Sequence, residues 1–487
     1  MGVLLGTFRV SYLSALACIG SFLFAYDTGI IGGILTLPSF SNDFDTHGNT
    51  SVASNSTSLL QAGAFFACFF TWPFTARFGR RLSIMLASLV FCIGAVIQVA
   101  PTHSIGAFYA ARVISGVGVG VATVIVPMYT AEMAPKEIRG KLGSLFQFFF
   151  TLGVMTSYWV DYGVSKHIPG TTSRQWQIPV GLQLVPGGIL GLGMLLTKES
   201  VRWLATKKRD EEALASLIWV RGEDTPAVRQ EYEEIVASIR EEERITEGYS
   251  LKELWLPINR FRVGLIIAIQ IGVQLTGNTS LAYYAPQVFT AIGAGSNTLF
   301  FAGFFGIAKV VACGIFVLFL IERVGRRGAL VYGAAVMGAL MLIVGVIVAT
   351  NAPKADGPIQ STSIAAVIMI YLEAMAYNMS WGPVPWLYMA EIMPSRIREG
   401  AVAIGTATQW LFNFAFSQVT PHAVENLGWR TFLMFCIFNW ALVVFAFFFV
   451  KETKGRSLED MDILFIKKIG QVNSIDNEKA TVTHEHV

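Results

Sequence analysis

The sequence predicts an all-α membrane protein in which twelve transmembrane helices form two pseudo-symmetric halves of six helices, with a short cytoplasmic helical linker. Of the 487 residues, 53% are hydrophobic and only 14% are charged, which is unusual for soluble domains. Apolar segments of about 20 residues, long enough to cross roughly 30 Å of hydrocarbon, recur along the chain. The loop Arg77–Arg81 returns in the second half as Arg323–Arg327, which indicates a duplicated bundle.

The predicted spans fall into two groups of six. The first group consists of 10–36, 59–76, 82–100, 105–130, 140–163 and 176–197. The second group consists of 260–290, 297–321, 328–350, 363–390, 398–421 and 429–450. The first apolar run is much longer than the roughly 7–15 residues of a signal-peptide core, so we expect it to be retained. We therefore expect an N-terminal six-helix bundle at 1–197 and a C-terminal one at 259–451.

Two polar segments lie outside these bundles. The segment 198–258 mixes acidic and basic residues, as in Arg240-Glu241-Glu242-Glu243-Arg244. This pattern predicts short solvated helices beneath the bundle, without chemistry of their own. The segment 452–487 is polar and has no aromatic residue after Phe465, so we expect a cytoplasmic tail that is mostly disordered.

Basic residues gather in the loops on one side of the predicted bundle. These are Arg77, Arg80, Arg81, Lys136, Arg139, Lys141, Arg323, Arg326, Arg327, Arg396 and Arg398. The opposite loops carry Lys166, Arg174 and Lys354. The positive-inside bias predicts that both termini are cytoplasmic, and we expect a multi-pass protein of the plasma membrane. Asn49 and Asn55 begin glycosylation sequons in the first outer loop, which predicts a glycoprotein if the chain passes through the secretory pathway.

The sequence argues against an enzyme. We find no phosphate-binding loop, no metal-ligand cluster and no pairing of a nucleophile with a base. The five cysteines all lie within predicted spans at unpaired spacing, as expected for small buried hydrophobic residues. We expect no cofactor, no metal and no nucleic-acid partner.

Glutamates accompany the arginines in the repeated loops. Glu132-Met133-Ala134-Pro135 in the first half corresponds to Glu391-Ile392-Met393-Pro394 in the second. Acidic residues contribute little to topology, so we interpret these loops as an inner ring of ion pairs that closes one face of a passage. The alternative is that the charges only fix the topology. The predicted cytoplasmic gate consists of Arg80, Glu132, Arg139, Glu199, Arg326, Glu391, Arg398 and Glu452.

Several motifs resemble those of the sugar porter family of the major facilitator superfamily, over nearly the whole chain. They are Arg77–Arg81, Pro127-Met128-Tyr129 through Gly140, Glu199-Ser200-Val201-Arg202-Trp203-Leu204, Tyr283-Tyr284-Ala285-Pro286, Arg323–Arg327, Gly382-Pro383-Val384-Pro385-Trp386 and Glu452-Thr453-Lys454-Gly455. The sequence as a whole resembles those of fungal proton-coupled sugar transporters. The resemblance implies two halves that rock around a central site, with the sugar held mostly by the second half.

Asp27 lies in the middle of the first predicted span. A charged carboxylate there costs at least ~2.5 kcal/mol on insertion scales, so it should face the interior and have a partner. Arg112, in the fourth span, is the basic residue that lies deep within the first half. Burial favours the protonated carboxyl and Arg112 favours the charged one, so Asp27 could bind and release a proton. An Asp at this position resembles the proton-coupled symporters of the family, in contrast to its facilitative members, which typically have Asn there. The alternative is a static Asp27–Arg112 pair.

Amides, hydroxyls and aromatic rings inside the spans are the groups that bind a sugar. The predicted substrate-binding residues are Phe24, Gln147, Gln274, Asn278, Thr279, Lys309, Trp386, Gln409 and Asn413. Most of them match the family's site positions or their neighbours. The chain departs from the family at Val273-Gln274, where two glutamines are usual, and at Thr279, where Asn is usual.

Lys309 and Glu373 are further charges within predicted spans. One interpretation is that they pair with each other. The other is that Lys309 receives a substrate carboxylate, as in a hexuronate or a quinate-like acid.

Together these observations predict a proton-coupled symporter that imports a monosaccharide (hexose or pentose) or sugar acid across the plasma membrane by alternating access. Its partners would be that small molecule, the proton and the lipid bilayer. A facilitative uniporter is the alternative. A sugar sensor that does not transport is a remote one, because the tail after the last span is short.

Overall fold

The computed structural model describes residues 2–46, 49–246, 251–295, 297–320, 323–351, 359–394 and 397–454, and their secondary structure is entirely helical. The first group of helices is α1 (Gly2–Ile34), α2 (Pro38–Phe44), α3 (Thr50–Phe78), α4 (Arg80–Val99), α5 (Ile105–Met133), α6 (Lys136–His167), α7 (Arg174–Leu182), α8 (Leu184–Gly193) and η1 (Met194–Leu196). A middle group follows with α9 (Val201–Thr206), α10 (Asp210–Arg221) and α11 (Pro226–Thr246).

The last group begins after α11. It consists of η2 (Leu251–Trp255), α12 (Pro257–Leu275), α13 (Asn278–Tyr283), α14 (Ala285–Ala291), α15 (Thr298–Ile315), η3 (Phe316–Leu320), α16 (Arg326–Thr350), α17 (Ser361–Asn378), α18 (Val384–Glu391), α19 (Arg398–Leu427) and α20 (Arg430–Phe449). Each of the twelve predicted spans therefore coincides with one helix or with a broken helix, as the sequence predicts. The predicted tail lies outside the described residues from 455 onward.

The broken spans have local causes. Gly277 separates α12 from α13 and has φ +88°, a left-handed conformation that favours glycine. A Cβ at this position would also lie 2.7 Å from the ring of Phe435. Pro383 precedes α18 and helps to separate it from α17. Both breaks fall within predicted spans, and broken helices commonly form substrate sites in transporters.

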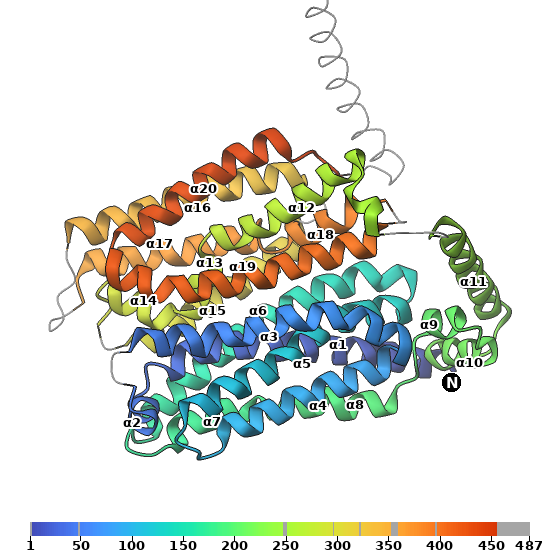
Figure 1. Ribbon diagram of the computed structural model, residues 1–487, viewed down its shortest axis with the longest axis horizontal. Helices are drawn as coiled ribbons and strands as arrows, with labels where there is room; N and C mark the ends of the chain where they lie inside the picture. The colour runs from blue at the N-terminus through green and yellow to red at the C-terminus, as the bar shows by residue number, and fades with distance from the viewer. Residues whose placement is uncertain are drawn as a thin grey trace, which may run out of the picture.

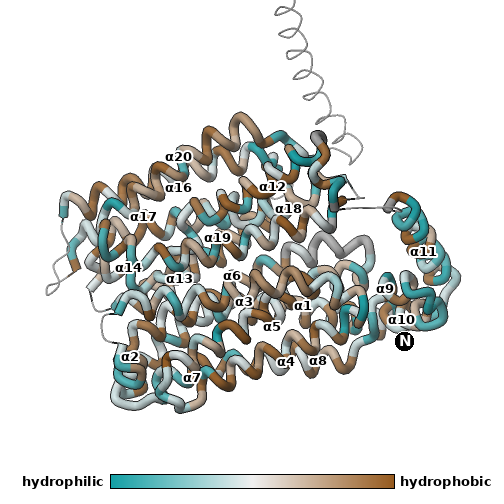
Figure 2. The backbone as a smooth tube through the Cα atoms, viewed as in Figure 1, coloured by the Kyte–Doolittle hydropathy of each residue, from teal (hydrophilic) through white to brown (hydrophobic). Residues whose placement is uncertain are grey.

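Eight helices in the described part of the chain are long and apolar enough to cross a membrane. They include α1, α3, α4, α5, α16 and α20, and their many hydrophobic residues are brown along the backbone tube in Figure 2. The other predicted spans correspond to α6, α12 to α14, α17 with α18, and α19. These are the spans that carry most of the predicted substrate-binding amides. The polar residues lower the hydropathy of these spans, and the helix breaks shorten their helices.

The spans pack into two groups that lie side by side (Figure 1). In the first group α1 packs on α6, and α5 packs on both α3 and α4. In the second group α16 packs on α20 and α17, and α12 packs on α19. The groups meet through α3 with α19 and through α6 with α15. At the second of these contacts, a Cβ on Gly306 would lie 2.6 Å from Cα of Met155, so glycine permits close helix approach.

The middle helices differ in part from the predicted solvated linker. Trp203, Leu204 and Leu217 of α9 and α10 are buried in the same hydrophobic cluster as Leu13 and Leu16 of α1. The Arg9 guanidinium donates to the Trp219 carbonyl at 2.6 Å. Only α11 extends away from the bundle as a largely polar helix (Figure 2). The prediction of purely solvated helices is therefore wrong for α9 and α10, whose apolar faces were overlooked among the charges.

The two ends of the bundle are distinct. We call the end with Gly79, Thr197 and Gly325 the arginine end, and the N-terminus and α9 to α11 also lie there (Figure 1). The opposite end, with α2 and the start of α3, is the α2 end. At the α2 end the two halves are in direct contact. The Tyr158 hydroxyl donates to the Ala282 carbonyl, and Gln287 Nε2 donates to the Gly32 carbonyl at 3.0 Å.

Two further contacts join α3 and α19 at the α2 end. Gln418 Nε2 donates to Asn55 Oδ1 at 2.8 Å and to Ser58 Oγ at 2.7 Å. The Thr50 hydroxyl donates to the Glu425 carboxylate at 2.5 Å. The α2 end of the molecule is therefore closed in this structure.

Candidate functional site

An ion pair lies in the interior of the first half. Arg112 Nη1 on α5 donates to Asp27 Oδ1 on α1 at 2.6 Å, and each side chain is only 1% exposed. The Arg112 Nε donates to the Ser56 carbonyl of α3 at 2.8 Å, whereas its Nη2 has no hydrogen-bond partner in the described residues. The pair thus joins three helices. Loss of the Asp27 charge would leave the guanidinium in need of a new partner.

Tyr283 of α13 is a residue of the second half that lies near the Asp27–Arg112 pair. Its hydroxyl accepts a 3.5 Å hydrogen bond from Asn413 Nδ2 of α19 and lies beside Thr28 and Gln61 of the first half. Thr28 directly follows Asp27 in α1. Tyr283 therefore connects a predicted substrate residue, Asn413, with the surroundings of the predicted proton site.

An aromatic cluster lies between the halves nearby. Phe24 of α1 contacts Trp410 of α19 edge to face and Phe150 of α6 at a tilt, with 5.3 Å between ring centroids in both cases. Trp410 is buried, but within the described part of the chain its indole N–H has no hydrogen-bond partner, and neither has Oε1 of the neighbouring Gln409. Apolar rings beside unsatisfied polar atoms are suited to the two faces of a polyhydroxylated ring.

A second charged group lies in the interior of the second half. Lys309 Nζ of α15 donates to Asn278 Oδ1 at 3.2 Å, and Asn278 Nδ2 donates to Glu373 Oε2 of α17 at 2.9 Å. All three side chains are buried, and none of the described residues offers Glu373 Oε1 a hydrogen bond. The interpretation of a direct Lys309–Glu373 pair is therefore wrong, because the Asn278 amide lies between the two charges.

The remaining predicted substrate residues lie on four helices. Gln274 of α12 is buried, and neither the nitrogen nor the oxygen of its side-chain amide has a hydrogen-bond partner in the part of the chain that the structure describes. Gln147 of α6 and Thr279 of α13 are half-buried, whereas Trp386 of α18 is 40% exposed. Buried amides without partners are rare in proteins, and a polar ligand or water would satisfy them.

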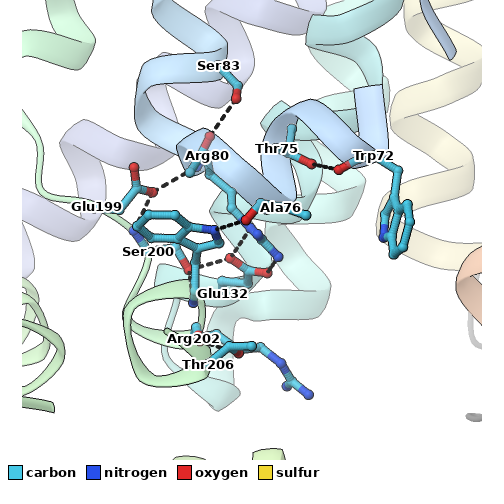
Figure 3. A network of polar contacts seen from close by, with 12 residues as sticks. Trp72, Thr75, Ala76, Arg80, Ser83, Glu132, Glu199, Ser200, Arg202 and Thr206 are labelled. Carbon is cyan, nitrogen blue, oxygen red and sulfur yellow. Dashed lines mark hydrogen bonds and ion pairs between the residues drawn. The ribbon is translucent and has the colours of Figure 1, made fainter. Parts of the chain in front are cut away.

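A polar network orders the arginine end of the first half (Figure 3). Arg80 forms an ion pair with Glu132 at 3.1 Å, and the Ser200 hydroxyl donates to the same carboxylate. Glu199 accepts hydrogen bonds from the backbone N–H groups of Arg80 and Arg81, at 2.9 and 3.1 Å. These N–H groups belong to the first turn of α4, so Glu199 caps this helix and complements its dipole.

The second half repeats this network. Arg326 pairs with Glu391 at 2.8 Å, and the Thr453 hydroxyl donates to Glu391 at 2.5 Å. Glu452 accepts from the backbone N–H groups of Arg326 and Arg327, at 2.7 and 3.1 Å. It thereby caps α16 as Glu199 caps α4.

These contacts differ from the predicted ring of ion pairs in two respects. The Arg80–Glu132 and Arg326–Glu391 pairs each join residues of the same half. Glu199 and Glu452 bind backbone N–H groups rather than arginine side chains. The Arg398 guanidinium donates to the Met393 carbonyl at 3.3 Å, and the side chain of Arg139 lies outside the described residues.

Glycine permits both caps to form. A Cβ on Gly79 would lie 2.3 Å from Glu199 Oε2, and a Cβ on Gly325 would lie 2.2 Å from Glu452 Oε2. Gly79 has φ +90°, which adds a conformational requirement for glycine that Gly325, with φ −67°, does not share. The two loops thus form the same carboxylate cap, although their glycines have different backbone conformations.

Four residues near these sites were missed in the sequence analysis: Gln61, Asp161, Tyr283 and Trp410. Asp161 lies in the predicted span 140–163 and is 0% exposed, so the rule that singled out Asp27 also applied to it. Trp410 adjoins the predicted Gln409. Tyr283 belonged to a recognised motif, but no sequence signal indicated that its hydroxyl would lie beside Gln61.

The fold and the site define a membrane transporter built from two similar helical bundles. The chain matches the family described as "Sugar (and other) transporter" over residues 13–465. It therefore belongs to the sugar porter family of the major facilitator superfamily, and proteins of this family are transporters, not enzymes.

Relatives and solved structures agree with this assignment. The "Probable quinate permease" of Aspergillus fumigatus is 35% identical over 481 residues, covering 94% of this chain and 88% of the relative. The "Quinate permease" of Emericella nidulans is 34% identical over 479 residues, covering 94% and 89%. The inward open conformation of the xylose transporter XylE from E. coli superposes with a TM-score of 0.78 at 26% identity, covering 93% of this chain and 99% of XylE. The proton:xylose symporter XylE bound to 6-bromo-6-deoxy-D-glucose gives 0.77 at 26% identity, covering 94% and 100%.

Proposed function

We propose that this protein is a proton-coupled symporter that imports a monosaccharide or a sugar acid across the plasma membrane by alternating access. The observation that carries the proposal is the buried Asp27–Arg112 pair, with 2.6 Å between Arg112 Nη1 and Asp27 Oδ1. A proton on Asp27 would remove the charge that holds Arg112 and would loosen the contact of α1 with α5. The similarity to a proton:xylose symporter supports the same mechanism.

The coupling would follow from the geometry around Tyr283. Protonation of Asp27 changes the field at Thr28 and Gln61, which lie beside the Tyr283 hydroxyl. Tyr283 in turn contacts Asn413, a proposed substrate residue, at 3.5 Å. Bound substrate would thereby favour one protonation state of Asp27. The residues that we propose to bind it are Phe24, Gln147, Gln274, Thr279, Trp386, Gln409 and Asn413.

We further propose that the arginine end faces the cytoplasm, with both termini on that side, since basic loops favour it. The domains would be 1–197, 198–258, 259–451 and 452–487, as expected from the sequence. The matched networks of Arg80 with Glu132 and Arg326 with Glu391 would then order the cytoplasmic ends of the two halves.

The substrate class that we favour is a cyclic polyhydroxy acid. Lys309 is a buried cation whose contact with Glu373 passes through the Asn278 amide, so Lys309 is not neutralised by direct contact with a carboxylate. An anionic substrate could supply that contact. The names of the relatives, quinate permeases, support an acid of this kind.

Expression in a host without its own sugar transporters would test both proposals. Xylose, glucose, glucuronate and quinate would be added in turn while the external pH and the uptake of each labelled compound are recorded. Symport predicts alkalinisation of the medium together with uptake. Uptake without alkalinisation for every transported compound would reject proton coupling and favour a facilitative uniporter.

A further inference from the structure

Asp161 is a second carboxyl group inside the first half, and neither the proposed proton site nor the proposed substrate site uses it. It lies on α6 with an exposed fraction of 0%, and neither of its oxygens has a hydrogen-bond partner among the described residues. The backbone of α1 lies directly against it, since a Cβ on Gly33 would be 1.9 Å from Asp161 Oδ2. Water has no room on this side of the carboxyl group.

The titratable groups that face Asp161 are phenols. They are Tyr26 of α1 and Tyr158 of α6, and Tyr158 in turn faces Tyr283 of α13. The Tyr26 hydroxyl donates to the Pro179 carbonyl of α7 at 3.1 Å, and the Tyr158 hydroxyl donates to the Ala282 carbonyl. Asp27, next to Tyr26 in sequence, is already paired with Arg112.

Among the described residues, the surroundings therefore offer a charged Asp161 neither a cation nor a free donor. An ionised carboxylate buried in this way costs several kcal/mol, whereas the neutral acid costs much less. The neutral acid therefore suits these surroundings better than the carboxylate does.

The position of Asp161 ties its protonation to the closed α2 end. Tyr158 lies one helical turn before Asp161, and its bond to Ala282 is one of the contacts between the halves. Gly32, which precedes Gly33, accepts the hydrogen bond from Gln287 of the other half. A Cβ on Gly32 would also lie 2.1 Å from the Tyr283 carbonyl oxygen. The groups that lie against Asp161 belong to α1 and α6 of the first half, and separation of the halves would free Tyr158 and Gly32 from their partners in the second half. Water can reach Asp161 once α1 and Tyr158 are released to move away from the carboxyl group.

We propose that Asp161 is a second proton-binding site, which must be occupied before the α2 end can close. The proton would bind from the solvent at that end, forming an O–H bond on the carboxylate, and would return to the same solvent when the end reopens. It is not carried across the membrane. This inference rests on alternating closure of the α2 end and not on proton coupling through Asp27.

The test is an exchange assay in whole cells with the internal pH clamped. Cells loaded with unlabelled quinate or xylose take up the labelled compound, so that net proton flux through Asp27 is not required. The external pH is varied from about 4 to about 8, which covers the titration of carboxyl groups in proteins. We expect exchange by the wild type to fall as the external pH rises, because deprotonated Asp161 opposes closure.

The Asp161→Asn variant mimics the neutral acid in size and charge. We expect its ratio of exchange at high to low pH to exceed that of the wild type by about threefold or more. Asp43→Asn is the matched control, because Asp43 also lies at the α2 end but accepts a 2.7 Å hydrogen bond from Trp176 Nε1, which an amide oxygen can still accept. Its pH profile should follow that of the wild type.

A profile of Asp161→Asn that coincides with the wild type would overturn the proposal. Loss of substrate-induced alkalinisation in this variant would also overturn it, since Asp161 would then carry the coupled proton. If Asp161→Asn fails to reach the cell surface, Asp161→Ala replaces it. The same two results, a wild-type pH profile or loss of alkalinisation, would then overturn the proposal. Absence of alkalinisation in the wild type would reject the proposed symport, whereas the exchange profiles would still decide the role of Asp161.

Discussion

Arg112 holds Asp27 through a 2.6 Å hydrogen bond at a point where both side chains are almost completely buried. The pair joins α1 to α5, and Arg112 also binds the backbone of α3. A change of one proton at Asp27 therefore acts on three helices at once. This relationship leads to two of the four predictions that follow.

The first prediction concerns coupling. Asp27→Asn removes the titratable group but keeps an oxygen that can accept from Arg112. We expect the variant to lose accumulation of substrate against its gradient, while exchange of labelled for unlabelled substrate continues. Accumulation ratios and exchange rates in the same cells measure both quantities. Uphill accumulation by Asp27→Asn would contradict the assignment of the coupling proton to this residue.

The second prediction concerns stability. Arg112→Gln leaves the Asp27 carboxylate buried without its cation, and breaking a buried pair in this way costs about 3–5 kcal/mol. We expect a clear decrease in the melting temperature of the purified protein. The double variant Asp27→Asn/Arg112→Gln should recover much of the loss, because no unpaired charge remains. Equal melting temperatures for the single and double variants would show that the charge interaction contributes little.

The third prediction concerns substrate class. Lys309→Gln removes the buried cation, so we expect the KM for quinate or glucuronate to rise at least about tenfold, equivalent to roughly 1.4 kcal/mol. The KM for a transported neutral sugar should change much less. Glu373→Gln is the matched comparison, since it removes the other charge and should not weaken binding of the acid. Equal effects of Lys309→Gln on acids and neutral sugars would assign Lys309 a structural role.

The fourth prediction concerns the loop at the start of α4. Gly79→Ala places a methyl group 2.3 Å from the Glu199 carboxylate and forces alanine to adopt φ +90°. Strained backbone of this kind costs about 1–3 kcal/mol, so transport and thermal stability should both fall. Gly188→Ala in α8 is the control, because no atom lies within 4 Å of the added Cβ. Wild-type melting and uptake in Gly79→Ala would show that Glu199 can move away without cost.

The sequence was sufficient to predict the helices but not all of their contacts. Twelve apolar segments and the duplicated Arg77–Arg81 loop led directly to the fold, because membrane spans require long runs of apolar residues. The buried faces of α9 and α10 were missed because charged residues surround them in sequence. Their burial depends on α1, which is about 200 residues away along the chain.

The interior polar residues illustrate the same limit. The rule that buried charges need partners selected Asp27, Arg112, Lys309 and Glu373 correctly as interior groups, as their burial shows. It could not reveal that the Asn278 amide separates Lys309 from Glu373, because this bridge depends on the break between α12 and α13. Tyr283 was overlooked as a site residue because tyrosine is a common packing residue.

The carboxylate caps on α4 and α16 have a mechanical consequence. Glu199 and Glu452 bind the main chain, so the starts of α4 and α16 are fixed by residues of their own half. In the proposed alternating access, each half would then rotate as a stiff body, without internal rearrangement at the arginine end. The energy that separates the two orientations of the halves must accordingly arise at the surface where they meet. Substitutions on the facing sides of α3, α6, α15 and α19 should therefore alter the speed of turnover more than those deep within either half.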